Sequence, residues 1–224
     1  MPTSNNGAVI WDVDGTLVDT AEMHFQAWTE LCESLGRPFS RDDFAATFGQ
    51  RNPEIFRHLF GERLSESKMD ELGFRKEELY RTAARKGVHL LPGVRALLEG
   101  LRAAGVKQAI GSSAPLANVE LILAITRSAS LFDAISSAED TQRGKPDPQV
   151  LLVAAHKLGV APGRCIVVED AVAGVQAAKA GGMKCIAVRF VGHHPEDKLR
   201  AAGADLVVRT LEGIGVEDVR ALLG

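Results

Sequence analysis

Short apolar runs rich in β-branched residues alternate with helical periods along most of this 224-residue chain. The runs have the length of buried strands, and the segments between them carry apolar residues at the spacing of amphipathic helices. Strands that alternate with helices predict right-handed crossovers and a parallel sheet covered on both faces. We therefore expect a doubly wound, Rossmann-like α/β core with strands at residues 8–11, 106–111, 134–136, 165–168, 184–188 and 205–208.

A long helical segment after the first strand interrupts this alternation. Residues 20–87 contain no strand pattern. The expected helices are one from Ala21 that ends at Gly36 and Pro38, one over 54–60 with Asn52 as its N-cap, and one or two over 65–86 interrupted near Gly73. The sequence therefore predicts a core domain of residues 1–19 and 88–224 and an inserted α-helical cap domain of residues 20–87.

The composition limits the classes of protein to which the chain can belong. Apolar residues make up 46% and charged residues 25%, as in globular domains, and the net charge is −3 without a basic cluster. These values argue against a nucleic-acid partner. Cys32, Cys165 and Cys185 are odd in number and far apart, which predicts buried, reduced thiols rather than a zinc site or a disulfide framework.

The chain shows no targeting or membrane signal. Residues 1–7 lack the basic and apolar regions of a signal peptide, and no apolar run approaches the roughly 20 residues needed to span a bilayer. We therefore expect a cytoplasmic protein that has no membrane partner and is a monomer or a small homo-oligomer.

Polar residues directly follow several of the predicted strands. In open parallel sheets, ligands bind at the carboxyl ends of the strands, so these side chains are candidates for a site. The candidates are Asp12 and Asp14 after the first strand, Ser112 and Ser113 after the second, Glu169 and Asp170 after the fourth, and Lys145 just before a helix. One edge of the sheet is thus expected to collect acids, hydroxyls and a lysine.

Each of these residue types has a role in phosphoryl transfer, which depends mainly on positioning and charge neutralisation. One carboxylate can attack phosphorus, and a second can protonate the departing alkoxide and later take a proton from water. Lysine and serine can hold the transferring oxygens. Residues two apart in a strand face the same way, so the carboxylates of Asp12 and Asp14 converge if the strand geometry persists that far, and a converging pair would recruit a hard cation such as Mg²⁺. Taken alone, the pair fits an Asp-Gly turn with solvated carboxylates equally well.

Four motifs in this order resemble the haloacid dehalogenase superfamily over most of the chain. They are Asp12-Val13-Asp14-Gly15-Thr16, Ser112, Gly144-Lys145-Pro146-Asp147-Pro148 and Val168-Glu169-Asp170. The resemblance implies that Asp12 is the nucleophile and Asp14 the general acid and base. It also implies a Mg²⁺ ion held by the carboxylates of Asp12 and Asp170 and the backbone carbonyl of Asp14, with Glu169 in or near the coordination shell. The residues then expected to bind the substrate phosphate are Ser112, Ser113 and Lys145.

Within the superfamily, Asp14 argues against a carbon-halogen substrate, because the true dehalogenases lack this second aspartate. The helical cap resembles that of the subgroup containing β-phosphoglucomutases and small sugar and polyol phosphatases. This likeness implies substrate-binding roles for His24, Arg51 and Lys76. His24 also fits a packed position on an apolar helix face, and Lys76 also fits a solvated charged face.

The loop after the serine motif distinguishes the two activities of this subgroup. The mutases it resembles carry a lysine and an asparagine for a second phosphate at the positions that Pro115 and Leu116 occupy in this chain. We therefore expect a Mg²⁺-dependent phosphatase that hydrolyses a small phosphorylated sugar or polyol through an aspartyl-phosphate intermediate, with a β-phosphoglucomutase as the alternative. A phosphoacceptor signalling domain and a non-catalytic scaffold fit less well, because the first has no helical cap and the second has no use for a cluster of acids.

Overall fold

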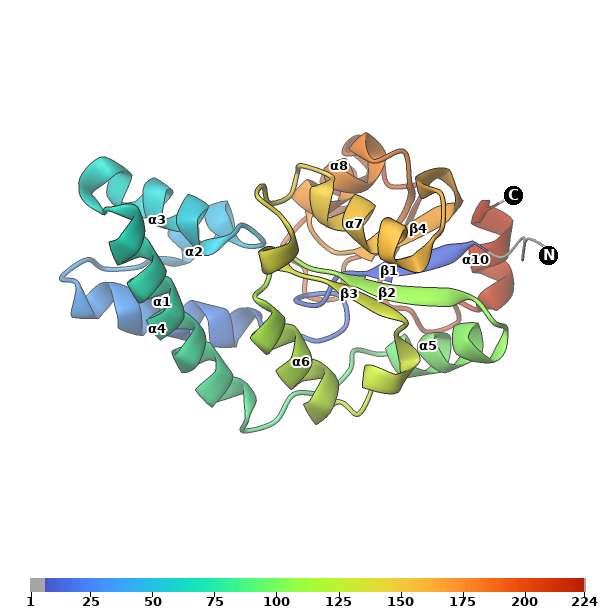
Figure 1. Cartoon of the computed structure of the whole chain (residues 1–224), viewed down its shortest axis with the longest axis horizontal. Helices are drawn as coiled ribbons and strands as arrows, with labels where there is room; N and C mark the ends of the chain where they lie inside the picture. Colours follow the sequence, from blue (N-terminus) through green and yellow to red (C-terminus); the bar gives the residue numbers. More distant parts are fainter. Residues whose placement is uncertain (1–6, 224) are drawn as a thin grey trace.

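The computed structural model describes residues 7–223 and contains a six-stranded parallel sheet in the order β3-β2-β1-β4-β5-β6 (Figure 1). The strands are β1 (Ala8–Trp11), β2 (Lys107–Gly111), β3 (Ala134–Ser136), β4 (Cys165–Glu169), β5 (Lys184–Val188) and β6 (Leu206–Val208). Each lies within one residue of its predicted bounds, and the doubly wound α/β prediction is confirmed. Residues 1–6, on which the signal-peptide expectation mostly rests, lie outside the described residues.

Strand β1 lies inside the sheet at the point where the strand order reverses. All four of its residues are fully buried, and it pairs with β2 on one side and β4 on the other. The register places Trp11 opposite Ile110 and Val168. Residues that follow these three strands therefore share one edge of the sheet, at the switch point where doubly wound folds bind ligands.

Alternate residues of β1 point to opposite faces of the sheet, and a separate apolar cluster covers each face. Val9 and Trp11 pack with α5 (Val94–Ala103), α6 (Leu116–Ile125) and α10 (Val216–Leu223). Ala8 and Ile10 pack with α7 (Gln149–Leu158), α8 (Val172–Ala180) and α9 (Glu196–Ala201). Figure 1 shows α5 and α6 on one side of the sheet and α7 and α8 on the other. The short 3-10 helices are η1 (Gly61–Arg63), η2 (Ala129–Leu131), η3 (Ala138–Asp140) and η4 (Pro162–Arg164).

The inserted segment forms a group of helices beside the carboxyl edge of the sheet (Figure 1). They are α1 (Ala21–Ser34), α2 (Arg41–Thr47), α3 (Asn52–Phe60) and α4 (Glu66–Ala84). These helices enclose an apolar cluster of their own around Trp28, Phe44 and Phe56. The α-helical cap that the sequence predicts is therefore present, and α2 is a helix that the pattern did not indicate.

Helix α4 differs from the expectation because it runs without a break through Gly73. A Cβ at Gly73 would lie 3.4 Å from Asn52 Nδ2 and 3.8 Å from Phe56 Cε2, so the glycine allows α3 to pack closely against α4. Asn52 is the first residue of α3 rather than its N-cap, which is Arg51. None of the helices in residues 7–223, α4 included, is long and apolar enough to cross a membrane.

Candidate active site

Three buried carboxylates gather at the carboxyl edge of β1 and β4. Asp12 directly follows β1, Glu169 is the last residue of β4, and Asp170 comes next. The backbone N–H of Asp12 donates to the carbonyl of Val168 (3.0 Å), which continues the β1–β4 register beyond the end of β1. One oxygen from each carboxylate lies within 4.8 Å of the others. The parallel register thus brings together acids that are far apart in the chain.

Lys145 lies between two of these carboxylates. Its Nζ donates to Asp12 Oδ1 and to Glu169 Oε1, both at 2.6 Å, and its side chain is 3% exposed. Burial raises the pKa of Asp12 to about 7, together with the charge of Glu169 and against the attraction of Lys145. Burial and the neighbouring carboxylates of Glu169 and Asp12 raise the pKa of Asp170 well above its usual value. Three buried acids share one ammonium group, so they cannot all ionise without a further cation.

The donor atoms of this cluster fit a hard divalent cation. They are all carboxylate oxygens, which Mg²⁺ prefers, and a cation would relieve their mutual repulsion. Glu169 Oε2 also accepts from the backbone N–H groups of Asp170 and Ala171, at 2.7 Å each. Because Lys145 occupies its other oxygen, Glu169 has less acceptor capacity left for a cation than Asp12 and Asp170 have.

Two glycines leave the space that the carboxylates occupy. Gly15 has a φ of +90°, in the left-handed region, and a Cβ there would overlap the carboxylate of Asp170. Gly174 lies in the first turn of α8, where a Cβ would overlap the carboxylate of Glu169. Sequence reasoning missed this role of Gly174, because a glycine within a helix indicates close helix packing first.

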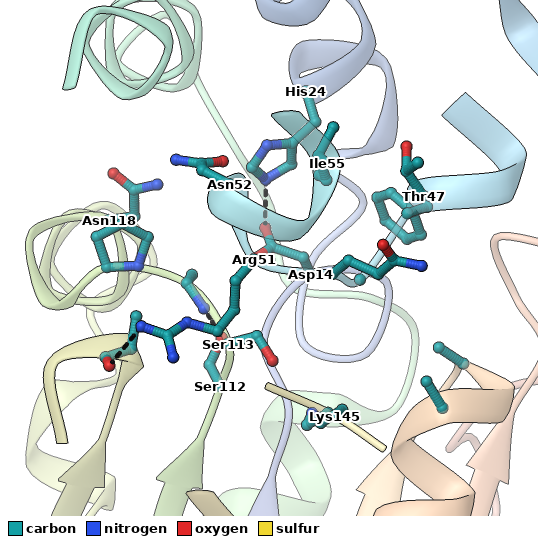
Figure 2. A pocket seen from close by; sticks show the side chains of 18 of the residues that line it. Asp14, His24, Thr47, Arg51, Asn52, Ile55, Ser112, Ser113, Asn118 and Lys145 are labelled. Atoms are coloured by element: carbon teal, nitrogen blue, oxygen red, sulfur yellow. Dashed lines mark hydrogen bonds and ion pairs between the residues drawn. The ribbon is translucent and has the colours of Figure 1, made fainter. Parts of the chain in front are cut away.

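The carboxylate of Asp14 has different partners, which come from the cap and the segment leading into it. Its Oδ1 accepts from Thr20 Oγ1 (2.5 Å), His24 Nε2 (3.2 Å) and Tyr80 OH (3.3 Å). Burial acts to raise the pKa of Asp14, but the contacts with His24 and Thr20 outweigh it and lower the pKa to about 2. Figure 2 shows the bond to His24 as a dashed line. Strand β1 ends at Trp11, before either aspartate, so the strand alternation does not extend to Asp12 and Asp14, yet both residues line the same cavity.

His24 and Lys76 continue the contacts of Asp14 into the cap. Lys76 Nζ lies 2.8 Å from His24 Nδ1 and 2.9 Å from Glu77 Oε1. Lys76 is only 2% exposed, so it does not lie on a solvated helix face. His24 also packs, since its ring stacks on that of Tyr80 with the centroids 4.0 Å apart. Both cap residues that the resemblance singled out therefore lie on the cap side of Asp14.

Ser112 and Ser113 follow β2 at the same edge of the sheet (Figure 2). The backbone N–H of Ser112 donates to the carbonyl of Ser136 (3.0 Å), and Ser112 Oγ accepts from the N–H of Ala114 (3.1 Å). Ser113 Oγ is buried and has no hydrogen-bond partner among the described residues. A buried hydroxyl without a hydrogen-bond partner is energetically unfavourable. An oxygen of a bound ligand could supply the partner that Ser113 Oγ lacks.

Arg51 connects the cap to the core. Its Nη1 and Nη2 donate to the carbonyls of Thr141 (3.1 Å) and Ala138 (3.2 Å). A Cβ at Gly144 would lie 2.9 Å from the Arg51 side chain, so the lysine-motif loop passes close beside it. Sequence reasoning missed these contacts, because no local pattern reports a partner 90 residues away.

A cavity of about 220 Å³ lies between the cap and the core, and every predicted site residue lines it. The core contributes the acid cluster, the serines and the lysine. The cap contributes an apolar wall that includes Phe44, Phe48, Ile55 and Met69. The polar lining residues that sequence reasoning did not single out include Thr47, Gln50, Asn52, Asp70, Glu77 and Asn118.

The fold and the site together define an α/β protein with a buried cluster of acids and a lysine beneath a helical cap. The sequence profile of the haloacid dehalogenase-like hydrolases matches residues 9–188, and the chain belongs to this family. The resemblance proposed from the four motifs is therefore confirmed.

Relatives from this family are similar over nearly the whole chain. A β-phosphoglucomutase of Bacillus subtilis (strain 168) is 35% identical over 217 residues, which cover 94% of this chain and 92% of the relative. Hexitol phosphatase A of Escherichia coli (strain K12) is 35% identical over 209 residues, 92% of each chain. The crystal structure of a β-phosphoglucomutase from Clostridium difficile has a TM-score of 0.88 at 25% identity and covers 97% of both chains. The chain is thus an enzyme of the phosphatase and phosphomutase group, and the signalling and scaffold alternatives are wrong.

Proposed function

We propose that the protein is a Mg²⁺-dependent phosphatase that hydrolyses a small phosphorylated sugar or polyol through a phosphoenzyme on Asp12. The observation that carries this proposal is the division of the site between two aspartates. Asp12 lies in the acid cluster beside Lys145, and Asp14 is held by groups on the cap side. This division supports attack on phosphorus by one carboxylate and proton transfer by the other.

The residues proposed to hold Mg²⁺ are Asp12, Asp170, the backbone carbonyl of Asp14 and Glu169. The first two have the acceptor capacity, and the raised pKa values of Asp12 and Asp170 support the assignment, because they indicate that the cluster needs a cation to balance its carboxylates. When bound there, the ion would neutralise the repulsion between an anionic nucleophile and an anionic phosphate ester.

In the first half-reaction, a carboxylate oxygen of Asp12 attacks phosphorus, and the bond from phosphorus to the ester oxygen breaks. Asp14 gives its proton to the departing alkoxide, so the product leaves as a neutral alcohol. In the second half-reaction, water attacks phosphorus, the bond to Asp12 breaks, and Asp14 takes the proton of the water. Lys145 and the hydroxyls of Ser112 and Ser113 bind the oxygens of the transferring group.

Proton transfer by Asp14 depends on what lies beside it. In the protein alone its pKa is about 2, which suits the second half-reaction, where it acts as a base. A phosphate dianion bound nearby raises the pKa of a carboxyl group by charge repulsion, which favours the protonated form needed in the first. A divalent cation acts in the opposite direction on Asp12, whose pKa of about 7 would fall toward the range of a nucleophilic carboxylate.

The size of the cavity beneath the cap favours a small substrate. The loop after β2 favours hydrolysis rather than phosphoryl transfer between sugars. The cavity of about 220 Å³ has room for a compact metabolite. A mutase must also hold a second phosphate, but Pro115 and Leu116 carry no charge. Nη1 and Nη2 of Arg51 donate to core carbonyls, and its buried Nε, which has no partner among the described residues, supports the proposed role of Arg51 in substrate binding. The alternative is a β-phosphoglucomutase, as the B. subtilis relative is named. Both activities share the first half-reaction.

The test is phosphate release from a panel of sugar, polyol and short-acid phosphates, measured with Mg²⁺ and then with a chelator. β-Glucose 1-phosphate in the panel is also analysed for glucose 6-phosphate. Mg²⁺-dependent release from a few small substrates supports the phosphatase. Conversion of β-glucose 1-phosphate without release would establish the mutase instead, and activity that survives the chelator would overturn the metal assignment.

The division into a core of residues 1–19 and 88–224 and a cap of residues 20–87 is also proposed, supported by the separate apolar cluster of the cap helices. A cytoplasmic location is supported by Cys32, Cys165 and Cys185, which are buried and unpaired, as in reducing compartments. Size-exclusion chromatography with light scattering would test the proposed monomer or small homo-oligomer.

A further inference from the structure

A second buried hydrogen-bond network is centred on the carboxylate of Glu77 in α4, which accepts a hydrogen bond from Lys76. Glu77 is 5% exposed, and its two oxygens accept three hydrogen bonds. Oε1 accepts from Lys76 Nζ (2.9 Å) and Asn52 Nδ2 (2.8 Å), and Oε2 accepts from Asn118 Nδ2 (2.6 Å). Burial opposes ionisation of this carboxyl group, but Lys76 and the other contacts outweigh it and lower the pKa of Glu77 to about 2. The group is therefore an anion across the physiological range.

Asn118 makes this network span the two parts of the molecule. It lies in the first turn of α6 in the core, whereas Glu77 and Arg81 belong to α4 in the cap. Its Nδ2 donates to Glu77, and its Oδ1 accepts from Arg81 Nη1 (2.8 Å). A flipped amide would place donor against donor and acceptor against acceptor, so the two partners fix its orientation. Figure 2 shows Asn118 and Asn52 among the residues that line the pocket.

The network determines which nitrogen of His24 carries the proton. A lysine ammonium group is a donor only, so His24 Nδ1 must accept the hydrogen bond from Lys76. In the neutral ring the proton then resides on Nε2, which donates to Asp14 Oδ1 at 3.2 Å. Glu77 is the carboxylate that pairs with the buried ammonium of Lys76. Removing it would leave a buried cation without its partner, which is strongly unfavourable.

We propose that Glu77 and Asn118 are positioning residues that couple docking of the cap on the core to the orientation of Asp14. When α4 docks against α6, Asn118 completes the bonds of Glu77, Glu77 holds Lys76 against His24, and His24 holds Asp14 in place for proton transfer. This inference rests on the proposed function, because it assigns a purpose to the acid and base role of Asp14.

The experiment compares kcat/KM for two kinds of ester in the parent enzyme and in Glu77→Gln. One is the sugar or polyol phosphate of the panel that the parent hydrolyses fastest, and the other is p-nitrophenyl phosphate. An alkoxide leaving group needs a proton from Asp14, whereas p-nitrophenolate leaves without one. Glutamine offers one acceptor to the three donors that surround Glu77, so it cannot reproduce the network. We expect kcat/KM to fall roughly tenfold or more for the alkyl ester and distinctly less for the aryl ester.

Glu71→Gln is the matched control, since Glu71 lies on the same helix with its side chain 67% exposed and pairs with Lys68. Glu71→Gln should leave kcat/KM unchanged for both esters. Asn118→Ala is the second variant, which tests the inference from the core side if Glu77→Gln does not fold. Asn118→Ala should also lower kcat/KM more for the alkyl ester than for the aryl ester. Thermal unfolding of each variant confirms that the protein compared is folded.

A double variant separates positioning from a purely structural contact. If Glu77 acts through Lys76, then Glu77→Gln should cost little further activity in a Lys76→Met background. An equal loss on both esters in the folded variants, or full additivity in the double variant, would overturn the inference. Because the parent enzyme is measured on the same panel, absence of phosphate release from the parent would count against the proposed function instead.

Discussion

Gly174→Ala should destabilise the protein and disable the acid cluster, although alanine ordinarily stabilises a helix. Gly174 lies within α8, where replacing glycine by alanine gains about 1 kcal/mol from helix propensity alone. The added Cβ would overlap the carboxylate of Glu169, and Oε1 is the nearest atom. That oxygen accepts the hydrogen bond from Lys145, and the other accepts two backbone N–H groups.

The magnitude follows from the bonds that a displaced carboxylate loses. A hydrogen bond to a charged group contributes about 1.5–3 kcal/mol. Losing the bond to Lys145 and one of the backbone bonds therefore costs about 4 kcal/mol, and helix propensity offsets about 1 kcal/mol of it. We expect a net loss of about 3 kcal/mol in the free energy of unfolding, with a weaker stabilisation by added Mg²⁺.

Urea unfolding at several Mg²⁺ concentrations measures both quantities. The matched control is Gly100→Ala within α5, where the new Cβ would make an ordinary contact 3.4 Å from Val216 Cγ2. That variant should be as stable as the parent or more stable, because it gains helix propensity without displacing a charged group. If Gly174→Ala is as stable as Gly100→Ala and keeps the full response to Mg²⁺, then Gly174 does not maintain the position of the Glu169 carboxylate.

Three further predictions concern the acids. Asp12→Asn should retain the fold and lose turnover, because an amide is a poor nucleophile, and an active Asp12→Asn enzyme in the phosphate-release assay would contradict the nucleophile assignment. Asp14→Asn should slow both half-reactions, and rapid-quench detection of phosphoenzyme at the parent rate would contradict its role as the acid. The pKa of Glu77 is lowered from 4.5 to about 2, so its stabilising contribution is complete above pH 4.5 and declines as the pH falls toward 2. Urea unfolding should therefore show the stability difference between the parent and Glu77→Gln narrowing over that interval, and a constant difference would contradict the ion pair with Lys76.

The sequence by itself determined the sheet and the residues at its edge. Strand position depends on local apolar patterning, and the residue after a strand is known once the strand is located. Because the strands are parallel and in register, Asp12, Ser112 and Glu169 had to meet at one edge. The four motifs therefore located the core of the site, and the resemblance carried by them identified the family.

Only the tertiary structure decided the partners of these residues. The carboxylates of Asp12 and Asp14 have different partners, since Asp12 accepts from Lys145 and Asp14 accepts from Thr20, and the strand period does not predict either contact. Glu77 stands in a run of charged residues that is typical of a solvated face, yet docking of the cap buries it against Asn118, 41 residues away. Such contacts depend on how two helices from separate parts of the chain approach each other, and a local pattern does not encode that distance. For the same reason the space that Gly174 leaves for Glu169 became visible only in three dimensions.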